Sequence, residues 1–225
     1  MQYQIKGNPL PYVEINLEQG EQVKCQRGAM SWMSAGIEMN TQGGGLGKMF
    51  SKALTGEAMF ENIYTARTPG YIAFASSLPG NILPVQIEPG RDVICQKSAY
   101  LAATTGVDIS IFFHRRLGAG FFGGEGFIMQ RLSGNGLAFV EIDGSVEVKE
   151  LAPGESLYID TGYLAMMDST CSMDIQTVGS VKNALLGGEG IFNTVVRGPG
   201  KVYLQSMPVA KLSASLYMPQ AGKQL

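Results

Sequence analysis

The chain has 225 residues, of which 45% are hydrophobic and 16% are charged, and its net charge at pH 7 is −2. The apolar content is sufficient for a full core, whereas the charged fraction lies below the roughly 25% of typical soluble domains. A low-charge surface fits a protein that buries area in subunit contacts. The nearly neutral charge excludes both a basic field for nucleic acid and a polybasic membrane anchor.

Targeting and redox features are sparse. The first twenty residues lack the basic head and apolar run of a signal peptide, and no stretch approaches the ~20 apolar residues that span a bilayer. The three cysteines, Cys25, Cys95 and Cys171, form no CxxC pair. These features favour a soluble protein in the reducing cytoplasm.

The first predicted element is a strand at 3–6, and a strand–turn–strand pattern follows it. The pattern reads apolar-x-x-Gly-polar-x-apolar-x-apolar and occurs at 17–25, 87–95 and 151–159. Its glycines are 70 and 64 residues apart: Gly20, Gly90 and Gly154. Each follows Gln or Pro, which predicts a tight turn between two strands with period-two alternation.

Three further patterns follow each copy of the first. The second ends in an apolar–acidic–apolar strand, with acidic residues Glu38, Asp108 and Asp174. The third is a Gly-Glu pair: Gly56-Glu57, Gly124-Glu125 and Gly188-Glu189. The fourth is an arginine before a glycine turn and a strand: Arg67, Arg131 and Arg197, with strands at 71–74, 137–142 and 202–204. Four patterns in one order, three times over, predict an internal repeat.

The predicted fold is therefore all-β, with three tandem repeats at about 1–70, 71–135 and 136–206 and a tail at 207–225. Glycine-rich inserts at 41–55, 110–123 and 176–187 are predicted to be loops with at most a turn or two of helix.

Two local features add to this prediction. The residues 139–148 predict a hairpin, because Asp143-Gly144 suits a type I′ turn. The strand at 202–204 is predicted to begin a fourth, unfinished copy. Its edge would be exposed unless another strand, from this chain or a neighbouring one, or the tail covers it.

No segment forms a recognisable catalytic motif. The glycine-rich 43–49 fails as a phosphate loop, because Gln42 and Met49 replace the residues that this loop needs. His114 is the only histidine, which is too few for a cupin-type metal site, and no nucleophile elbow accompanies it. Cys25 and Cys95 align with Ile159, so we expect them to act as small core residues.

The recurrent carboxylates leave two readings open. They could perform acid–base chemistry or bind a hard cation. Alternatively, they accept backbone N–H bonds at the glycine turns or pair with the recurrent arginines. The structural reading is favoured because a catalytic pair seldom recurs in every copy of a repeat. We assign no catalytic, cofactor or metal site, and we expect the recurrent Gly, Glu and Arg residues to be structural.

The Gly-Glu and Pro-Gly patterns resemble those of a widespread family of uncharacterised bacterial and archaeal proteins. This family is related to a fungal mitochondrial-biogenesis protein of the altered-inheritance-of-mitochondria family. The resemblance is carried by residues 19–21, 89–90 and 153–155 and by the three Gly-Glu pairs, and it covers essentially the whole chain. It implies a short double-stranded β-helix repeated three times, similar to the tryptophan RNA-binding attenuation protein. Proteins of that fold form rings, so the resemblance implies a homotrimer of nine repeats.

Three functions follow as hypotheses. The first is a non-enzymatic, ring-forming scaffold or binding protein without a cofactor. The second is a ring that binds RNA or a small ligand, which rests on analogy of fold alone. The third is a metal-assisted enzyme that uses the repeated Glu and Asp positions. The low charge and the triplication favour the first.

Overall fold

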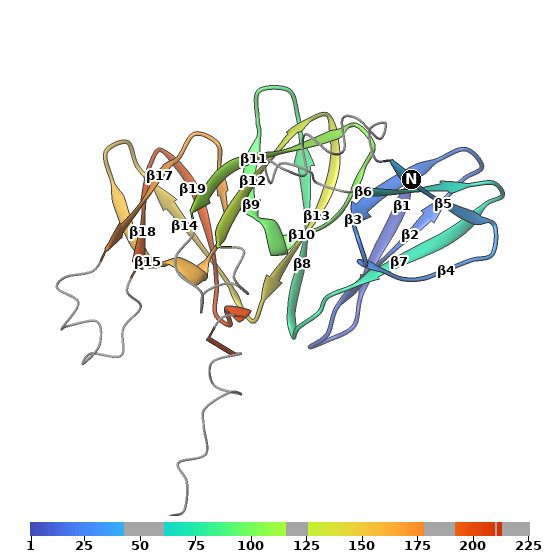
Figure 1. The fold of residues 1–225 in the computed structure, drawn as a ribbon, viewed down its shortest axis with the longest axis horizontal. Helices are drawn as coiled ribbons and strands as arrows, with labels where there is room; N and C mark the ends of the chain where they lie inside the picture. Colours follow the sequence, from blue (N-terminus) through green and yellow to red (C-terminus); the bar gives the residue numbers. More distant parts are fainter. Residues whose placement is uncertain (43–60, 116–125, 178–191, 210, 213–225) are drawn as a thin grey trace, which may run out of the picture.

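In the computed structural model, the chain is described at residues 1–42, 61–115, 126–177, 192–209 and 211–212. These residues form strands β1 to β19 in four antiparallel sheets, which confirms the all-β prediction (Figure 1). The first sheet lies at one end of the molecule and the fourth at the other, with the second and third between them. No helix in the described residues is long and apolar enough to cross a membrane.

The two end sheets are small. The first has, in spatial order, β1 (Gln2–Lys6), β2 (Tyr12–Leu17), β7 (Gly70–Ala75) and β4 (Met30–Met33). The fourth has β15 (Ser156–Asp160), β18 (Phe192–Arg197) and β17 (Ser172–Thr177).

The two inner sheets have six strands each. The second has β5 (Ile37–Gln42), β6 (Glu61–Ala66), β3 (Gln22–Gln26), β10 (Tyr100–Thr104), β13 (Gly136–Asp143) and β8 (Gly80–Ile87). The third has β11 (Val107–Arg115), β12 (Phe127–Gly134), β9 (Val93–Gln96), β16 (Leu164–Asp168), β19 (Gly200–Gln205) and β14 (Val146–Leu151). Short 3-10 helices lead into β10 and β16: η1 (Lys97–Ala99) and η3 (Thr161–Tyr163).

Strand pairing follows one scheme along the chain. The strand β7 lies between β2 and β4, β13 between β8 and β10, and β19 between β14 and β16. Likewise, β6 lies between β5 and β3, β12 between β11 and β9, and β18 between β17 and β15. The inner sheets arise because β3 pairs with β10 and β9 pairs with β16.

The apolar core consists of three clusters, each between two successive sheets. The first packs Ile15 and Phe74 of the first sheet against Val23 and Cys25 of the second. The second cluster joins the second and third sheets, and the third joins the third and fourth sheets. Because side chains alternate along a strand, each inner sheet contributes to two clusters.

The three predicted glycine turns are confirmed. Gly20, Gly90 and Gly154 have φ of +86°, +81° and +82°. In each turn, the N–H of the residue after glycine donates to the carbonyl three residues earlier, at 2.9–3.0 Å. A positive φ at the third turn position is the type II geometry, for which Pro at the second position and Gly at the third are suited. The turns join β2 to β3, β8 to β9 and β14 to β15.

One local prediction is wrong. No hairpin forms at Asp143-Gly144, because β13 pairs with β8 and β10 while β14 pairs with β19 in the next sheet. The strand at 202–204 is covered on both edges by strands of the same chain, since β19 lies between β14 and β16. The predicted inserts begin inside β5, β11 and β17, and their remainder lies outside the described residues.

The turn glycines yield the first prediction. A Cβ at Gly154 would meet no atom within 4 Å, so the cost of a side chain there comes from φ alone. Gly154→Ala should therefore lower the free energy of unfolding by about 1–2 kcal/mol. Gly154→Asn should cost less, because asparagine tolerates this conformation. Urea unfolding of both variants measures the difference, and equal costs would contradict this explanation.

Candidate functional site

Those recurrent residues that the structure describes do not converge on one site. Arg67 pairs its Nε with Glu38 Oε2 at 2.8 Å on the exposed surface. Arg131 pairs instead with Asp92 at 2.8 Å and lies over the ring of Phe112, and Arg197 is exposed at the end of β18. The Gly-Glu pairs lie outside the described residues: Gly56-Glu57, Gly124-Glu125 and Gly188-Glu189.

The first carboxylate set is distributed over three sheets. Glu38 is on β5, Asp108 on β11 and Asp174 on β17, which are end strands of the second, third and fourth sheets. Within the described part of the chain, no three His, Cys, Asp or Glu side chains are grouped as metal ligands. Of this set, Glu38 pairs with a recurrent arginine, whereas the predicted pairing of the Gly-Glu glutamates with the arginines falls outside the described residues.

The cysteines are buried and unpaired, in agreement with their predicted core role. Burial raises the pKa of both Cys25 and Cys95 to about 12, which disfavours the reactive thiolate. His114 is exposed near the end of β11.

Residues from distant parts of the chain meet instead at two strand contacts, which we call the seams. At the first seam, β3 pairs with β10, with Cys25 opposite Ala102 and Lys24 opposite Ala103. At the second seam, β9 pairs with β16, with Cys95 opposite Met166 and Ile94 opposite Met167. The seams are the candidate site, because they hold most of the buried polar side chains described below.

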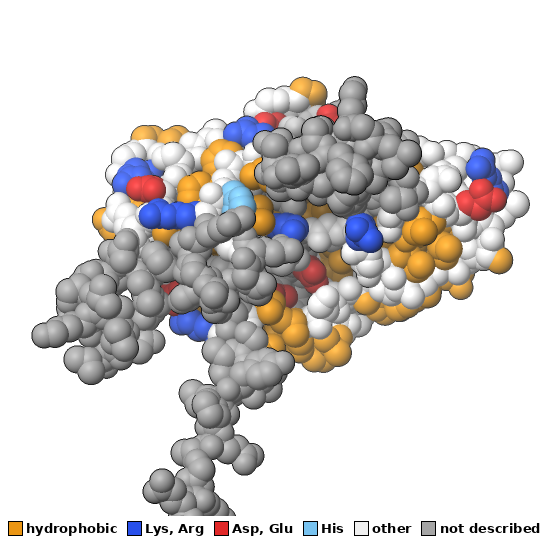
Figure 2. All heavy atoms as spheres, in the orientation of Figure 1, with side chains coloured by type: hydrophobic (Ala, Val, Ile, Leu, Met, Phe, Trp, Pro, Cys, Tyr) orange, Lys and Arg blue, Asp and Glu red, His pale blue; other side chains and the backbone are white. Residues whose placement is uncertain are grey.

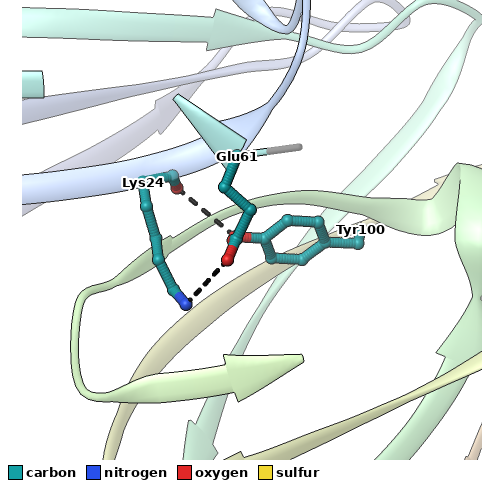
Figure 3. Close-up of polar contacts among 3 residues, drawn as sticks. All are labelled: Lys24, Glu61 and Tyr100. Carbon is teal, nitrogen blue, oxygen red and sulfur yellow. Dashed lines mark hydrogen bonds and ion pairs between the residues drawn. The ribbon is translucent and has the colours of Figure 1, made fainter. Parts of the chain in front are cut away.

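The first seam contains a buried ion pair (Figure 3). Lys24 Nζ lies 3.0 Å from Glu61 Oε2, and their side chains are only 8% and 22% exposed. The hydroxyl of Tyr100 lies 3.1 Å from the other carboxylate oxygen and 3.4 Å from the backbone oxygen of Lys24. Burial raises the pKa of Tyr100 well above its usual value, so the hydroxyl stays protonated and donates. The network connects β3, β6 and β10.

A glutamine crosses each seam. Gln26, the last residue of β3, donates its side-chain amide to the backbone oxygen of Lys97 in η1. Gln96, the last residue of β9, donates to the backbone oxygen of Gly162 in η3 at 3.4 Å. The buried Gln205 donates to the same oxygen at 2.9 Å. These amides satisfy connector carbonyls that burial would otherwise leave without partners.

Two carboxylates on β13 have perturbed acidities. Burial raises the pKa of Glu141 to about 7, the negative charge of Asp143 adds to this effect, and a hydrogen bond from the N–H of Ser77 opposes it. Burial likewise raises the pKa of Asp143 to about 6. The two residues are two positions apart, so they face the same side of the strand. They can hold protons near neutral pH, but within the described residues no third His, Cys, Asp or Glu side chain completes a metal-ligand group with them.

Sequence reasoning missed the seam residues. Lys24, Glu61 and Tyr100 are separated by tens of residues and belong to no motif, so only the fold brings them together. The glutamines carried a signal: Gln26 and Gln96 each directly follow the first pattern, at the same offset from its cysteine.

The chain is similar to proteins of one family over nearly its whole length. The family model described as mitochondrial biogenesis AIM24 matches residues 3–207. The chain belongs to this family. An uncharacterised protein from Streptococcus pyogenes serotype M6 is 28% identical over 224 residues, covering 94% of this chain and 88% of the relative. A crystal structure of a Streptococcus pyogenes protein superposes with a TM-score of 0.79 and 24% identity, covering 96% and 97% of the two chains. At that identity the likeness shows the fold.

The ion pair of this AIM24 member yields a prediction. Glu61→Ala should destabilise the fold by about 3 kcal/mol, because it leaves the Lys24 ammonium buried without its partner. At the second seam, Ile94 and Met129 occupy the corresponding places and are both fully buried. The double variant Lys24→Ile/Glu61→Met should therefore lie within about 1 kcal/mol of the parent protein. Urea unfolding tests both, and a double variant as unstable as Glu61→Ala would refute this account.

The carboxylates on β13 predict a pH dependence. A pKa raised in the folded state means that the folded protein binds more protons, so the contribution to stability is complete below the ordinary values of 4.5 and 3.8. It is lost as pH rises through about 6 to 7. Glu141→Gln should reduce the fall in melting temperature between pH 4.5 and pH 8. Glu150→Gln, at an exposed position, is the matched control and should leave the pH profile unchanged.

Proposed function

We propose that this AIM24-family chain is a non-enzymatic scaffold that assembles with further copies of itself into a closed ring. The observation that carries the proposal is the seam. Strand β3 pairs with β10 and strand β9 pairs with β16, so each pairs with the third strand of the next unit, whereas β15 has only β18 as a partner within the described residues. At the opposite end, β4 has only β7.

The proposal treats the chain as three six-stranded units, β2–β7, β8–β13 and β14–β19, in the single triplicated body predicted from sequence. Support comes from the recurrent strand order and from a shared irregularity. The register shifts by one residue between Met30 and Trp32, between Tyr100 and Ala102, and between Leu164 and Met166. A bulge at the same place in β4, β10 and β16 is a specific local feature. The short double-stranded β-helix of the attenuation protein is the proposed form of each unit.

The seam contact is of a kind that can build a ring. Each seam joins unlike strands, so the contact is head-to-tail. Such contacts produce a closed ring if successive rotations close and an open filament if they do not. Closure by three chains would give nine units, which is the homotrimer implied by the resemblance.

A structural role also accounts for the polar side chains that could have served chemistry. Lys24, Glu61 and Tyr100 bond to one another, and Gln96 and Gln205 bond to connector backbone. Nothing in the described residues favours the RNA-binding or metal-assisted alternatives over this role. The cytoplasmic location stays a prediction.

The proposal is tested by native mass. Light scattering of the purified full chain at micromolar concentration should give about three times its 24.1 kDa mass, independent of concentration over a tenfold dilution. Masses that grow steadily with concentration would indicate an open filament. A 24.1 kDa monomer would contradict the scaffold proposal altogether.

A further inference from the structure

We propose that the partner of the β15 edge is β4 of a second copy of this chain, paired antiparallel with Met33 opposite Tyr158. This inference rests on the proposed scaffold function and specifies the contact that builds it. The two strands lie at opposite ends of the molecule, so one chain offers both halves of the contact (Figure 1).

The internal seams fix the register. Relative to their own sheets, Trp32 and Met33 correspond to Ala102 and Ala103, and to Met166 and Met167, since each pair follows the shared bulge. On the other side, the glycine turns align Tyr158 with Lys24 and Ile94. Lys24 lies opposite Ala103, and Ile94 lies opposite Met167. The same relation sets Tyr158 opposite Met33.

Burial distinguishes the free ends from the internal seams. Trp32 is 41% exposed, whereas Ala102 and Met166 at the corresponding position are 0% and 2% exposed. Tyr158 is 66% exposed, whereas Lys24 and Ile94 are 7% and 0% exposed. Each end thus presents a large aromatic side chain at a position that the neighbouring unit covers elsewhere.

In the proposed contact, apolar core residues of the second copy would cover the side chains of Trp32 and Tyr158. Ala102 belongs to the first apolar cluster, which the preceding unit supplies, and Ile94 belongs to the third cluster, which the following unit supplies. Trp32 therefore faces the side on which a preceding unit would lie, and Tyr158 faces the side of a following one. In Figure 2, hydrophobic side chains gather at the end of the molecule that holds the first sheet.

Most of the other end strands carry features that discourage pairing. Five of the six contain a proline or a charged side chain inside the strand: Glu38 in β5, Pro84 in β8, Asp108 in β11, Lys149 in β14 and Asp174 in β17. The sixth, β1, has one charge at its last residue, Lys6, which pairs with Glu14. Such residues blunt sheet edges. In contrast, β4 has neither, and β15 has a single charge at its last residue, Asp160, whose carboxylate pairs with Lys211 of the same chain.

The intermolecular seam would lack the glutamine bond of the internal seams. Asp160 occupies the place of Gln26 and Gln96, and a carboxylate cannot donate to a connector carbonyl. Backbone pairing and the burial of Trp32 and Tyr158 would therefore hold the contact, which makes it sensitive to charge at these two positions.

The first test is charge substitution at the edge. Tyr158→Arg and, separately, Trp32→Arg should each reduce the native mass at micromolar concentration to that of the 24.1 kDa chain. The matched control is Val148→Arg: Val148 is 46% exposed and lies on β14 in the third sheet, which contains neither β4 nor β15. This variant should keep the parent mass. Circular dichroism checks that the variants retain the β fold.

Crosslinking tests the register directly. Met33→Cys and Tyr158→Cys chains are prepared separately, mixed and oxidised, and a covalent dimer that contains one chain of each kind is expected. Replacing Met33→Cys by Val148→Cys should abolish it. The native cysteines do not interfere because all three are buried.

The outcomes separate this inference from the scaffold proposal. A multimeric parent protein that gives no mixed crosslink and is insensitive to Tyr158→Arg would overturn the β4–β15 contact and leave the scaffold standing. A monomeric parent protein would overturn both. Loss of assembly in the two edge variants, retention in Val148→Arg and a mixed crosslink would support both.

Discussion

The backbone pairing of β3 with β10 and of β9 with β16 is the constraint on which the rest of the structure depends. It converts short groups of strands into two continuous six-stranded sheets. Because side chains alternate along a strand, a slip of one residue at a seam would transfer every side chain beyond it to the wrong core. The register at the seams therefore determines which residues enter each of the three apolar clusters.

Pairing alone does not hold such a contact. Each seam has three opposed residue pairs, and a backbone hydrogen bond has a net contribution of only about 1 kcal/mol. The rest of the stabilising free energy comes from burial of the side chains on both faces of the paired strands. Lys24 and Ile94 occupy corresponding places and are both buried, one through an ion pair and the other through apolar packing. This position therefore requires a side chain that is fully buried and satisfied, and both a paired lysine and an isoleucine meet that requirement.

What could be predicted from sequence was local. The strand–turn–strand segments and the core cysteines follow from period-two alternation and from Pro-Gly or Gln-Gly at the turn, which act over a few residues. The Asp143-Gly144 hairpin failed because both sides of β13 are occupied by strands from elsewhere in the chain. The ion pair between Lys24 and Glu61 had no local signal, since the fold alone brings β3, β6 and β10 together. Only the recurrent Gln26 and Gln96 marked a seam within the sequence itself.

An unpaired strand is normally a liability, because it offers a template for any other strand. Among the described residues, β4 and β15 each have one partner strand, and two features limit the risk at their other edges. Both strands are short, at four residues in β4 and five in β15, and the bulge in β4 matches the bulges in β10 and β16, which restricts the registers that fit. In the proposed assembly, the pairings of β3 with β10 and of β9 with β16 would be two equal steps that fix the rotation from one unit to the next. A third step of the same kind would continue that rotation, so the geometry inside one chain would determine whether the assembly closes.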